Sequence, residues 1–238
     1  MEETFGTHRF PFKIGTEDFS ISVEKETNSF IYKRERGEDK IEKILLVDSG
    51  EMLINPVEPV NLPKKVTTHL LVEFDKTVLV GPKEKKNIIL SFPVEIGVFL
   101  TSAKGPKMLD VFSLVEPKYT LYGHQKKGVL CRYWKSEVYI FQPEFHPFYK
   151  GVLELIITNT TSRWFELTKV VLNVYGMRIY YSPQLVSVKA EMKITRLGIA
   201  EVVCRDTPLK KGMKKSVEIY TSVSLPGVQT KFLMEEGL

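Results

Sequence analysis

The sequence has little of the two residue types that most metal and redox sites need. It contains 2 cysteines and 4 histidines in 238 residues. Cys131 and Cys204 lack the spacing of a metal-binding pair, and no two histidines stand two or four residues apart. We therefore expect no metal site. Each cysteine is interpreted as a small core residue on a strand, with a disulfide between them as the alternative.

Long apolar runs are missing as well. No stretch reaches the roughly 18 apolar residues of a membrane-spanning helix. The start, Met1-Glu2-Glu3-Thr4, is acidic and does not fit a signal peptide. The expected location is the cytoplasm, where the sequon Asn159-Thr160-Thr161 would have no role.

The common catalytic motifs are also absent. There is no G-x-S-x-G and no glycine-rich phosphate loop followed by a helix. Gly81-Pro82-Lys83 lacks the glycine spacing of a phosphate loop, and a turn after a strand explains it better. We expect no catalytic residue and no cofactor.

Glutamine is scarce, with 4 residues, whereas 26 lysines and 23 glutamates are present. This composition is typical of proteins from hyperthermophiles, so we expect a heat-loving source. The net charge of +5 is a small excess of 34 basic over 29 acidic residues, and it does not require a nucleic-acid partner.

Alternation of apolar and polar residues is the strongest pattern that is present. From Leu185 to Ile194, the residues Val186, Val188, Ala190, Met192 and Ile194 share one face, and Ser187, Lys189, Glu191 and Lys193 share the other. A period of two over this length predicts a strand with one buried and one solvated face.

Similar strands recur along the chain, and no amphipathic helix competes with them. They are expected at Phe19–Val23, Phe30–Arg34, Ile41–Val47, His69–Phe74, Thr77–Val80, Ile88–Phe92, Val94–Leu100, Tyr119–Tyr122, Gly151–Thr158, Trp164–Val174, Met177–Tyr181, Ile199–Cys204 and Ser216–Tyr220.

The expected fold is all-β with little helix, as two immunoglobulin-like β-sandwich units packed in tandem. A polar stretch, Gly123–Gly128, suggests a boundary between an N-terminal β domain (1–125) and a C-terminal β-sandwich (126–238); Gln142–Tyr149 is the competing boundary. The prolines of 56–63 favour an extended crossover or edge segment. The tail, 225–238, is expected to form a helical turn or an arm.

A polar and aromatic cluster near the middle of the chain is the first candidate for binding. If 119–122 and 129–134 are neighbouring strands, several of its side chains line one patch of a composition typical of binding hot spots. The alternative is an ordinary sheet surface, with Arg132 paired to a carboxylate such as Glu137. The candidate binding residues are Lys118, Tyr122, His124, Arg132, Tyr133 and Trp134.

Two glutamates stand among apolar residues or prolines. Glu95 lies within an apolar strand and Glu58 between two prolines. Either could be an acid with a raised pKa, although a side chain facing water is the more frequent outcome.

Lysine pairs recur at expected turns. One interpretation is a surface that binds the phosphate groups of nucleic acid or anionic lipid. The simpler interpretation is a solvated loop surface that is rich in lysine. The pairs are 64–65, 85–86, 126–127, 210–211 and 214–215.

Several strings of residues resemble a known family when taken together. They are 55–63 (NPVEPVNLP), 92–98 (FPVEIGV), 118–123 (KYTLYG), 131–133 (CRY) and 232–238 (FLMEEGL). In combination the chain resembles DUF432, an archaeal family of unknown function. The resemblance implies an archaeal, cytoplasmic protein. It implies no activity and carries over no functional residue.

Three functions follow as hypotheses. The first is a non-enzymatic binding or adaptor protein that acts through sheet faces and loops, with a homodimer or a protein partner expected through exposed strand edges. The second is a hydrolase for a sugar or nucleotide, with a carboxylate or His124 in an interdomain cleft. The third, less favoured, is weak binding of nucleic acid or an anionic membrane surface by the lysine loops.

Overall fold

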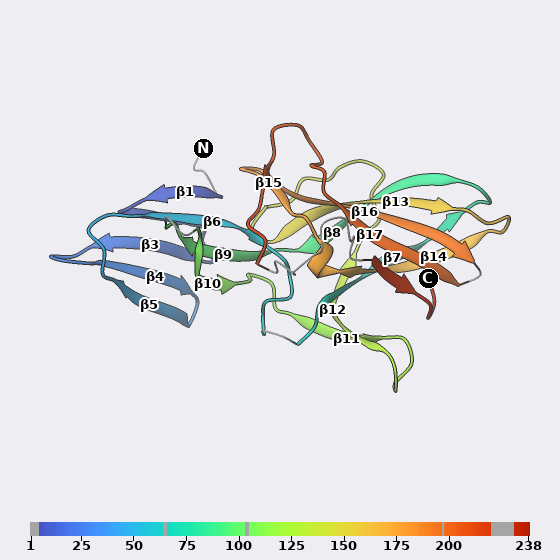
Figure 1. Cartoon of the computed structure of the whole chain (residues 1–238), viewed down its shortest axis with the longest axis horizontal. Coiled ribbons are helices and arrows are strands. Elements are labelled where there is room, and N and C mark those ends of the chain that lie inside the picture. The colour runs from blue at the N-terminus through green and yellow to red at the C-terminus, as the bar shows by residue number, and fades with distance from the viewer. Residues whose placement is uncertain (1–4, 64–65, 103–104, 197, 220–230) are drawn as a thin grey trace.

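The computed structural model describes residues 5–63, 66–102, 105–196, 198–219 and 231–238. These residues form nineteen strands, and their only helical element is a 3-10 turn, Val174–Gly176 (η1). The all-β class is therefore confirmed. Figure 1 shows the strands gathered into two lobes along one long axis.

The smaller lobe lies on the left in Figure 1 and contains two antiparallel sheets, ordered β1-β6-β9-β10 and β2-β3-β4-β5. A buried hydrogen bond joins the two sheets, in which the Tyr32 hydroxyl donates to the Asp110 carboxylate at 2.8 Å. The strands are β1 (Gly6–Arg9), β2 (Phe12–Gly15), β3 (Ser20–Lys25), β4 (Phe30–Arg36), β5 (Asp39–Leu45), β6 (Glu51–Val57), β9 (Glu95–Leu100) and β10 (Lys107–Phe112).

The larger lobe also contains two sheets. A four-stranded sheet has the order β11-β12-β7-β14, and a seven-stranded sheet has the path β18-β15-β16-β13-β8, with β17 beside β16 and β19 beside β17. The strands are β7 (His69–Val80), β8 (Lys85–Pro93), β11 (Lys118–Tyr122), β12 (Val129–Ser136), β13 (Lys150–Asn159), β14 (Phe165–Asn173), β15 (Tyr180–Ser182), β16 (Leu185–Arg196), β17 (Ile199–Arg205), β18 (Lys214–Lys215) and β19 (Lys231–Met234).

The alternating residues of β16 occupy the two faces as predicted, with one exception. The apolar set is buried, and Lys189, Glu191 and Lys193 reach solvent, whereas Ser187 is fully buried. The outward face carries cross-strand ion pairs: Lys189 to Glu154 of β13 and Arg205 of β17 to Glu191. The pattern that identified the strand thus also sets which side of the sheet faces the core.

The two lobes share a continuous core. Pro93 ends β8 in the larger lobe and β9 begins two residues later in the smaller one, so one extended run crosses between them. The rings of Phe19 and Phe148 meet edge to face with centroids 4.8 Å apart, and Phe5 contacts both Phe148 and Tyr181. Aromatic burial of this kind holds the lobes together.

Sheets extend across the expected domain boundary. β7 and β8 precede residue 125, yet β7 pairs with β12 and β14, and β8 pairs with β13. The division into 1–125 and 126–238 stays a prediction about folding units. The sheets themselves group 69–93 with the C-terminal half of the chain.

Several strand predictions differ from the structure, and the strand expected at Met177–Tyr181 is limited to Tyr180–Ser182. β7 continues through Asp75-Lys76, where a turn was expected, because an irregularity in its pairing with β14 absorbs the extra residues. No strand forms at 216–219, and Tyr220 lies outside the described residues. In the tail, 231–234 forms β19 and packs against β17, which fits the arm and not the helical turn of the two alternatives, and 225–230 lie outside the described residues.

Candidate functional site

The sequence-predicted binding residues lie on β11, β12 and the hairpin between them, but they do not share one face. Lys118 is opposite Tyr133 and Tyr122 opposite Val129, so these side chains lie on one side of the sheet. Arg132 and Trp134 lie on the other side, because successive residues of a strand alternate. The role of the six residues in binding stays a prediction, and they form no single patch.

Arg132 is an interior residue. It is 1% exposed and forms an ion pair with Glu95, which is fully buried. The same guanidinium nitrogen donates to the Pro59 carbonyl at 2.7 Å, and the Asn61 amide donates to Glu95 at 3.0 Å. The partner of Arg132 is therefore Glu95 of β9, not Glu137 as the sequence suggested.

Glu95 and Glu58 both turn inward, contrary to the expectation that they face water. Glu58 is 3% exposed. Burial raises the pKa of Glu95, and the neighbouring Arg132 opposes that shift. Since the carboxylate is closed off from solvent and paired, it has a structural role in joining β9 to β12.

Tyr122 and His124 line a small pocket of about 210 Å³ next to the C-terminal strand. The Tyr122 hydroxyl donates to the Gly237 carbonyl at 3.3 Å and accepts from the Glu236 amide at 3.1 Å. These bonds fix the end of the chain against the sheet, so Tyr122 is a docking point for the tail.

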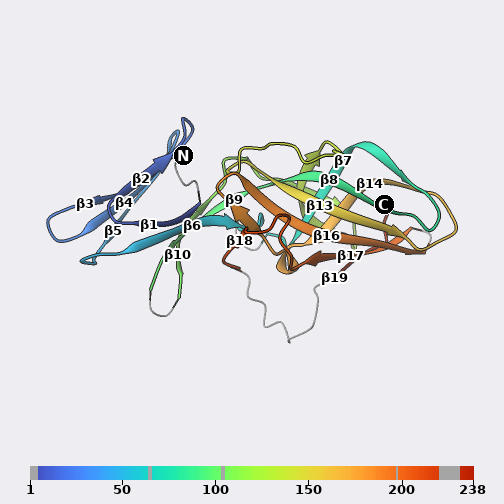
Figure 2. The ribbon, with the colours of Figure 1, turned by 90° about the horizontal axis from the view of Figure 1, so that it is seen from above.

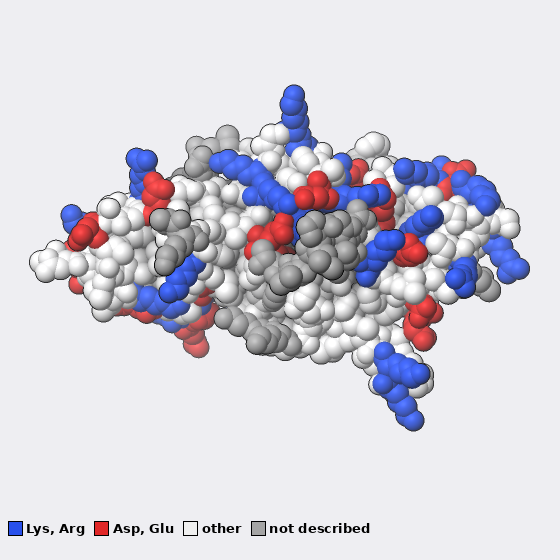
Figure 3. Space-filling model, in the orientation of Figure 1, with Lys and Arg blue, Asp and Glu red and all other residues white. Residues whose placement is uncertain are grey.

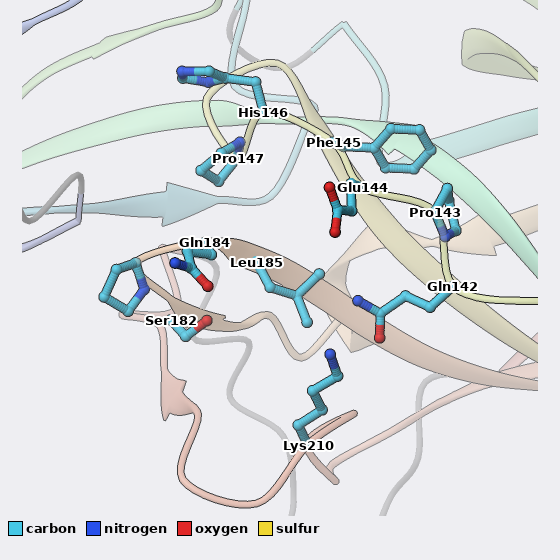
Figure 4. Close-up of a pocket in the computed structure, with 11 residues that line it drawn as sticks. Gln142, Pro143, Glu144, Phe145, His146, Pro147, Ser182, Gln184, Leu185 and Lys210 are labelled. Carbon is cyan, nitrogen blue, oxygen red and sulfur yellow. The ribbon is translucent and has the colours of Figure 1, made fainter. Parts of the chain in front are cut away.

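A larger pocket of about 630 Å³ lies between the β12–β13 connection and the β15–β16 turn. Figure 4 shows Glu144 and Lys210 pointing into it from opposite sides, while the ring of His146 lies away from its centre. Glu144 is its single carboxylate among the described lining residues. Hydrolysis of a glycoside generally needs two carboxylates, so this pocket supports the hydrolase hypothesis weakly.

The third pocket has the most distinctive chemistry. It has a volume of about 560 Å³ and lies where three connections of the larger lobe end, namely β7–β8, β13–β14 and β16–β17. We call it the basic loop end. Its lining residues are Lys83, Thr161, Ser162, Arg163, Phe165, Thr195 and Arg196.

The charge of the basic loop end is of one sign. Three lining residues are cations, three carry a hydroxyl group, and none of those that the structure describes is acidic. Figure 3 shows several Lys and Arg side chains at the right-hand end of the molecule, where these loops lie in Figure 1, with acidic side chains among them. Within the described chain, neither Arg163 nor Arg196 has a carboxylate partner. Glu84, the acidic residue of the β7–β8 turn, is paired with Lys86 at 3.0 Å.

A buried asparagine ties two of the three loops together. Asn159, at the end of β13, is 1% exposed. Its side-chain amide donates to the carbonyls of Gly81 and Arg163 at 2.8 and 2.7 Å, and its oxygen accepts from the Thr161 amide at 2.9 Å. Because every polar atom of this side chain is used, the residue of the sequon is closed to modification in the folded chain, and the loops are held in fixed positions.

Thr160 and Lys83 complete this framework. Both the amide and the hydroxyl of Thr160 donate to the Ile194 carbonyl, which ties the β13–β14 loop to the end of β16. Lys83 has a φ of 59°, the only positive φ of a described residue other than glycine. Its ammonium donates to the Thr160 carbonyl at 2.5 Å. A backbone held in this sparsely populated region is frequent at functional sites.

The sequence does not reveal this site, although Lys83 of Gly81-Pro82-Lys83, interpreted there as a turn, is part of it. Arg163 and Arg196 are single cations in separate loops, so the pattern of lysine pairs does not include them. The three loops become neighbours because β13 lies between β8 and β16 in the sheet, an order that the sequence does not show. The one available signal was Asn159-Thr160-Thr161, because Asn and Thr favour turns that order neighbouring backbone.

Comparison with known proteins agrees with the resemblance seen in the sequence. A family model described as a protein of unknown function (DUF432) matches residues 4–235. The chain belongs to the DUF432 family. No curated protein and no solved structure matches it significantly. This DUF432 protein has, among its described residues, no helix able to cross a membrane and no group of three metal-ligating side chains.

Proposed function

We propose that this DUF432 protein is a non-enzymatic binding protein that holds a phosphate-bearing ligand at the basic loop end. The observation that carries the proposal is a concavity of about 560 Å³ lined by three cations and three hydroxyl side chains. The concavity is shallow and open to solvent, so it suits a charged ligand that binds at the surface. Guanidinium groups bind phosphate through two parallel hydrogen bonds, and hydroxyl groups add further donors.

The fixed geometry of the loops supports the proposal. A site that is ordered before binding loses less entropy when a ligand arrives. Asn159 and Thr160 hold the backbone through interior hydrogen bonds, so the backbone next to Lys83, Arg163 and Arg196 keeps its place without a ligand. The three cations remain exposed, and the Lys83 ammonium, which donates to the Thr160 carbonyl, can also donate to a ligand.

The fold of the two lobes is the second part of the proposal. We infer that each lobe is an immunoglobulin-like β-sandwich and that the two are packed in tandem. The two-sheet content of each lobe and the shared aromatic core support this arrangement. Sandwiches of this kind often use the loops at one end for recognition.

Calorimetric titration with inorganic tripolyphosphate tests the function. The variant Lys83→Ala/Arg163→Ala/Arg196→Ala should bind at least about tenfold more weakly, because hydrogen bonds between charged groups each contribute about 1.5–3 kcal/mol.

The matched control is Lys25→Ala/Lys126→Ala/Lys211→Ala, which removes the same charge from exposed lysines outside the described pockets. It should bind as the wild type does. Equal weakening in both variants would reduce the effect to net charge and contradict the proposed site.

A further inference from the structure

The strand β5 leaves one edge of its sheet unpaired. In the order β2-β3-β4-β5 it is the last strand, and its described contacts within the sheet are to β4. Figure 1 shows β5 as the outermost strand of the smaller lobe, and Figure 2 shows the same lobe from above. An unpaired edge presents free N–H and C=O groups to which another strand can bind.

The neighbouring edge strand, β10, is protected in ways that β5 is not. Its pairing with β9 contains a bulge between Met108 and Asp110. The Lys43 ammonium donates to the Leu109 carbonyl, and the Arg36 guanidinium donates to the Ser113 carbonyl. A bulge disrupts the regular edge of a strand, and a carbonyl that already accepts a side-chain hydrogen bond is not free to pair with a new strand. Lys43 belongs to β5 and Arg36 to β4, and no described bond covers the backbone edge of β5 itself.

The turn before β5 determines which of its backbone groups point outward. Arg36 pairs with Asp39 across the two-residue turn Gly37-Glu38, where Gly37 has a φ of 54°. In such a hairpin the flanking residues bond to each other, and alternate residues then bond toward β4. The backbone groups of Lys40 and Glu42 are therefore directed to the open edge.

The charges of β5 are complementary to a second copy of the same strand. The sequence reads Asp39-Lys40-Ile41-Glu42-Lys43. If two such strands run antiparallel with Ile41 opposite Ile41, Lys40 faces Glu42 and Asp39 faces Lys43 on both sides of the axis. Shifting the centre by one residue would place Lys40 opposite Lys40 or Glu42 opposite Glu42. Like charges directly opposite each other are destabilising, so the pattern selects one register.

We propose that two copies of this chain form a homodimer by antiparallel pairing of their β5 strands about a two-fold axis at Ile41. The two four-stranded sheets become one of eight strands. Such an interface is self-complementary, as two-fold symmetry requires. The dimer is independent of ligand binding at the basic loop end, which lies in the other lobe.

Contacts already present in one chain fit this pairing. Lys40 forms an exposed ion pair with Glu35 at 3.1 Å, and Asp39 pairs with Arg34 at 2.7 Å. In the dimer the partner's Glu42 extends the pair of Lys40 and Glu35 across the new strand boundary. Figure 3 shows basic and acidic side chains next to each other at the lower edge of the smaller lobe, where β5 lies.

The turn of the partner lies opposite the end of β5. In the proposed register Ile44, which is 66% exposed, faces Glu38 of the second copy. The partner's turn thus covers part of an apolar side chain that is open in the single chain. Partial burial of this kind adds to the backbone pairing.

Sedimentation velocity over a wide range of protein concentration tests the proposal. The wild type should show a reversible monomer–dimer equilibrium. The variant Glu42→Lys places lysines opposite each other and should weaken the dimer at least about tenfold. The double variant Lys40→Glu/Glu42→Lys restores opposite charges across the axis and should restore the dimer. Circular dichroism of each variant checks that the strands still form.

Oxidation of a single cysteine at the axis tests the register. Ile41→Cys should form a disulfide-linked dimer, because directly opposite residues of antiparallel strands have the Cα separation that a disulfide needs. Lys13→Cys, on the opposite edge strand β2, is the control and should remain monomeric. A monomeric wild type at every concentration, or a double variant as weak as Glu42→Lys alone, would overturn the proposal.

Discussion

The buried pair of Arg132 and Glu95 illustrates how a residue that looks like a binding hot spot can be a structural one. Arg132 belongs to β12, Glu95 to β9, and the Pro59 carbonyl accepts a further hydrogen bond from Arg132. Three segments distant in sequence therefore depend on one guanidinium. Removing one partner of such a pair leaves an isolated charge in the interior, which costs far more than the pair contributes.

Arg132→Met should destabilise the fold by about 3–5 kcal/mol, because Glu95 would lose its buried counter-charge. The double variant Glu95→Leu/Arg132→Met should recover most of that loss. Chemical denaturation of the two variants and the wild type measures the difference. A loss below about 1 kcal/mol for the single variant would contradict a structural role for the pair.

His69 makes stability depend on pH. Burial lowers the pKa of its imidazole, whose ring lies 4.8 Å from that of Phe232 on β19. The folded state therefore binds the proton less readily than the unfolded chain does. The contribution of His69 to the free energy of unfolding is complete above the unfolded pKa of about 6.5. It is lost as the pH falls through the lower pKa of the folded state.

His69→Phe should remove this part of the acid sensitivity while keeping the ring contact. Urea denaturation of variant and wild type between neutral and mildly acidic pH measures the slope of the free energy of unfolding against pH. An unchanged slope in the variant would show that other groups produce it.

The two thiols should be unreactive in the native state. Burial raises the pKa of both Cys131 and Cys204 to about 12, and neither forms a disulfide. Thiolate is the reactive form, so labelling at neutral pH should be slow until the chain is unfolded. Mass analysis before and after denaturation measures it. Rapid labelling of either cysteine in the folded protein would show that the burial is not maintained in solution.

At the scale of the element, the end of β13 determines the shape of the candidate site. Asn159 is the last residue of the strand, and its side chain connects the β7–β8 turn to the β13–β14 loop. Hydrogen bonds from the end of a strand to carbonyl groups of the loops restrict the motion of those loops, as the ladder of the sheet restricts the strand.

Asn159→Ala should cost about 2–3 kcal/mol of stability, because it leaves buried carbonyl groups without donors. It should also weaken tripolyphosphate binding without removing any positive charge. Denaturation and calorimetric titration measure the two effects. Full affinity in a destabilised variant would show that the loops hold their positions without this residue.

Individual elements show how far the sequence alone can predict this fold. The faces of β16 were predictable because one side is buried and the other solvated. The continuity of β7 was not, because Asp75-Lys76 has the composition of a turn, and only pairing with β14 keeps it in the sheet. The site depends on the same missing information. Lys83, Arg163 and Arg196 lie in loops that become neighbours only through the order of β8, β13 and β16.

At the scale of the whole molecule, two features have separate places. The basic loop end lies at the far end of the larger lobe, and the free edge of β5 lies in the smaller lobe (Figure 1). A dimer through β5 would leave the loops of both copies exposed. The dimer would then carry two ligand sites. A ligand with several phosphate groups that reaches both sites would bind more tightly, because binding at the first site raises its effective concentration at the second.

A crystal structure of the protein soaked with tungstate, a heavy analogue of phosphate, tests the central claim most directly. The account predicts anomalous density between the side chains of Lys83, Arg163 and Arg196, with the loops around Asn159 unchanged. Density confined to other lysine-rich surfaces, such as the hairpin at Lys126-Lys127, or no ordered density in the basic loop end, would contradict it.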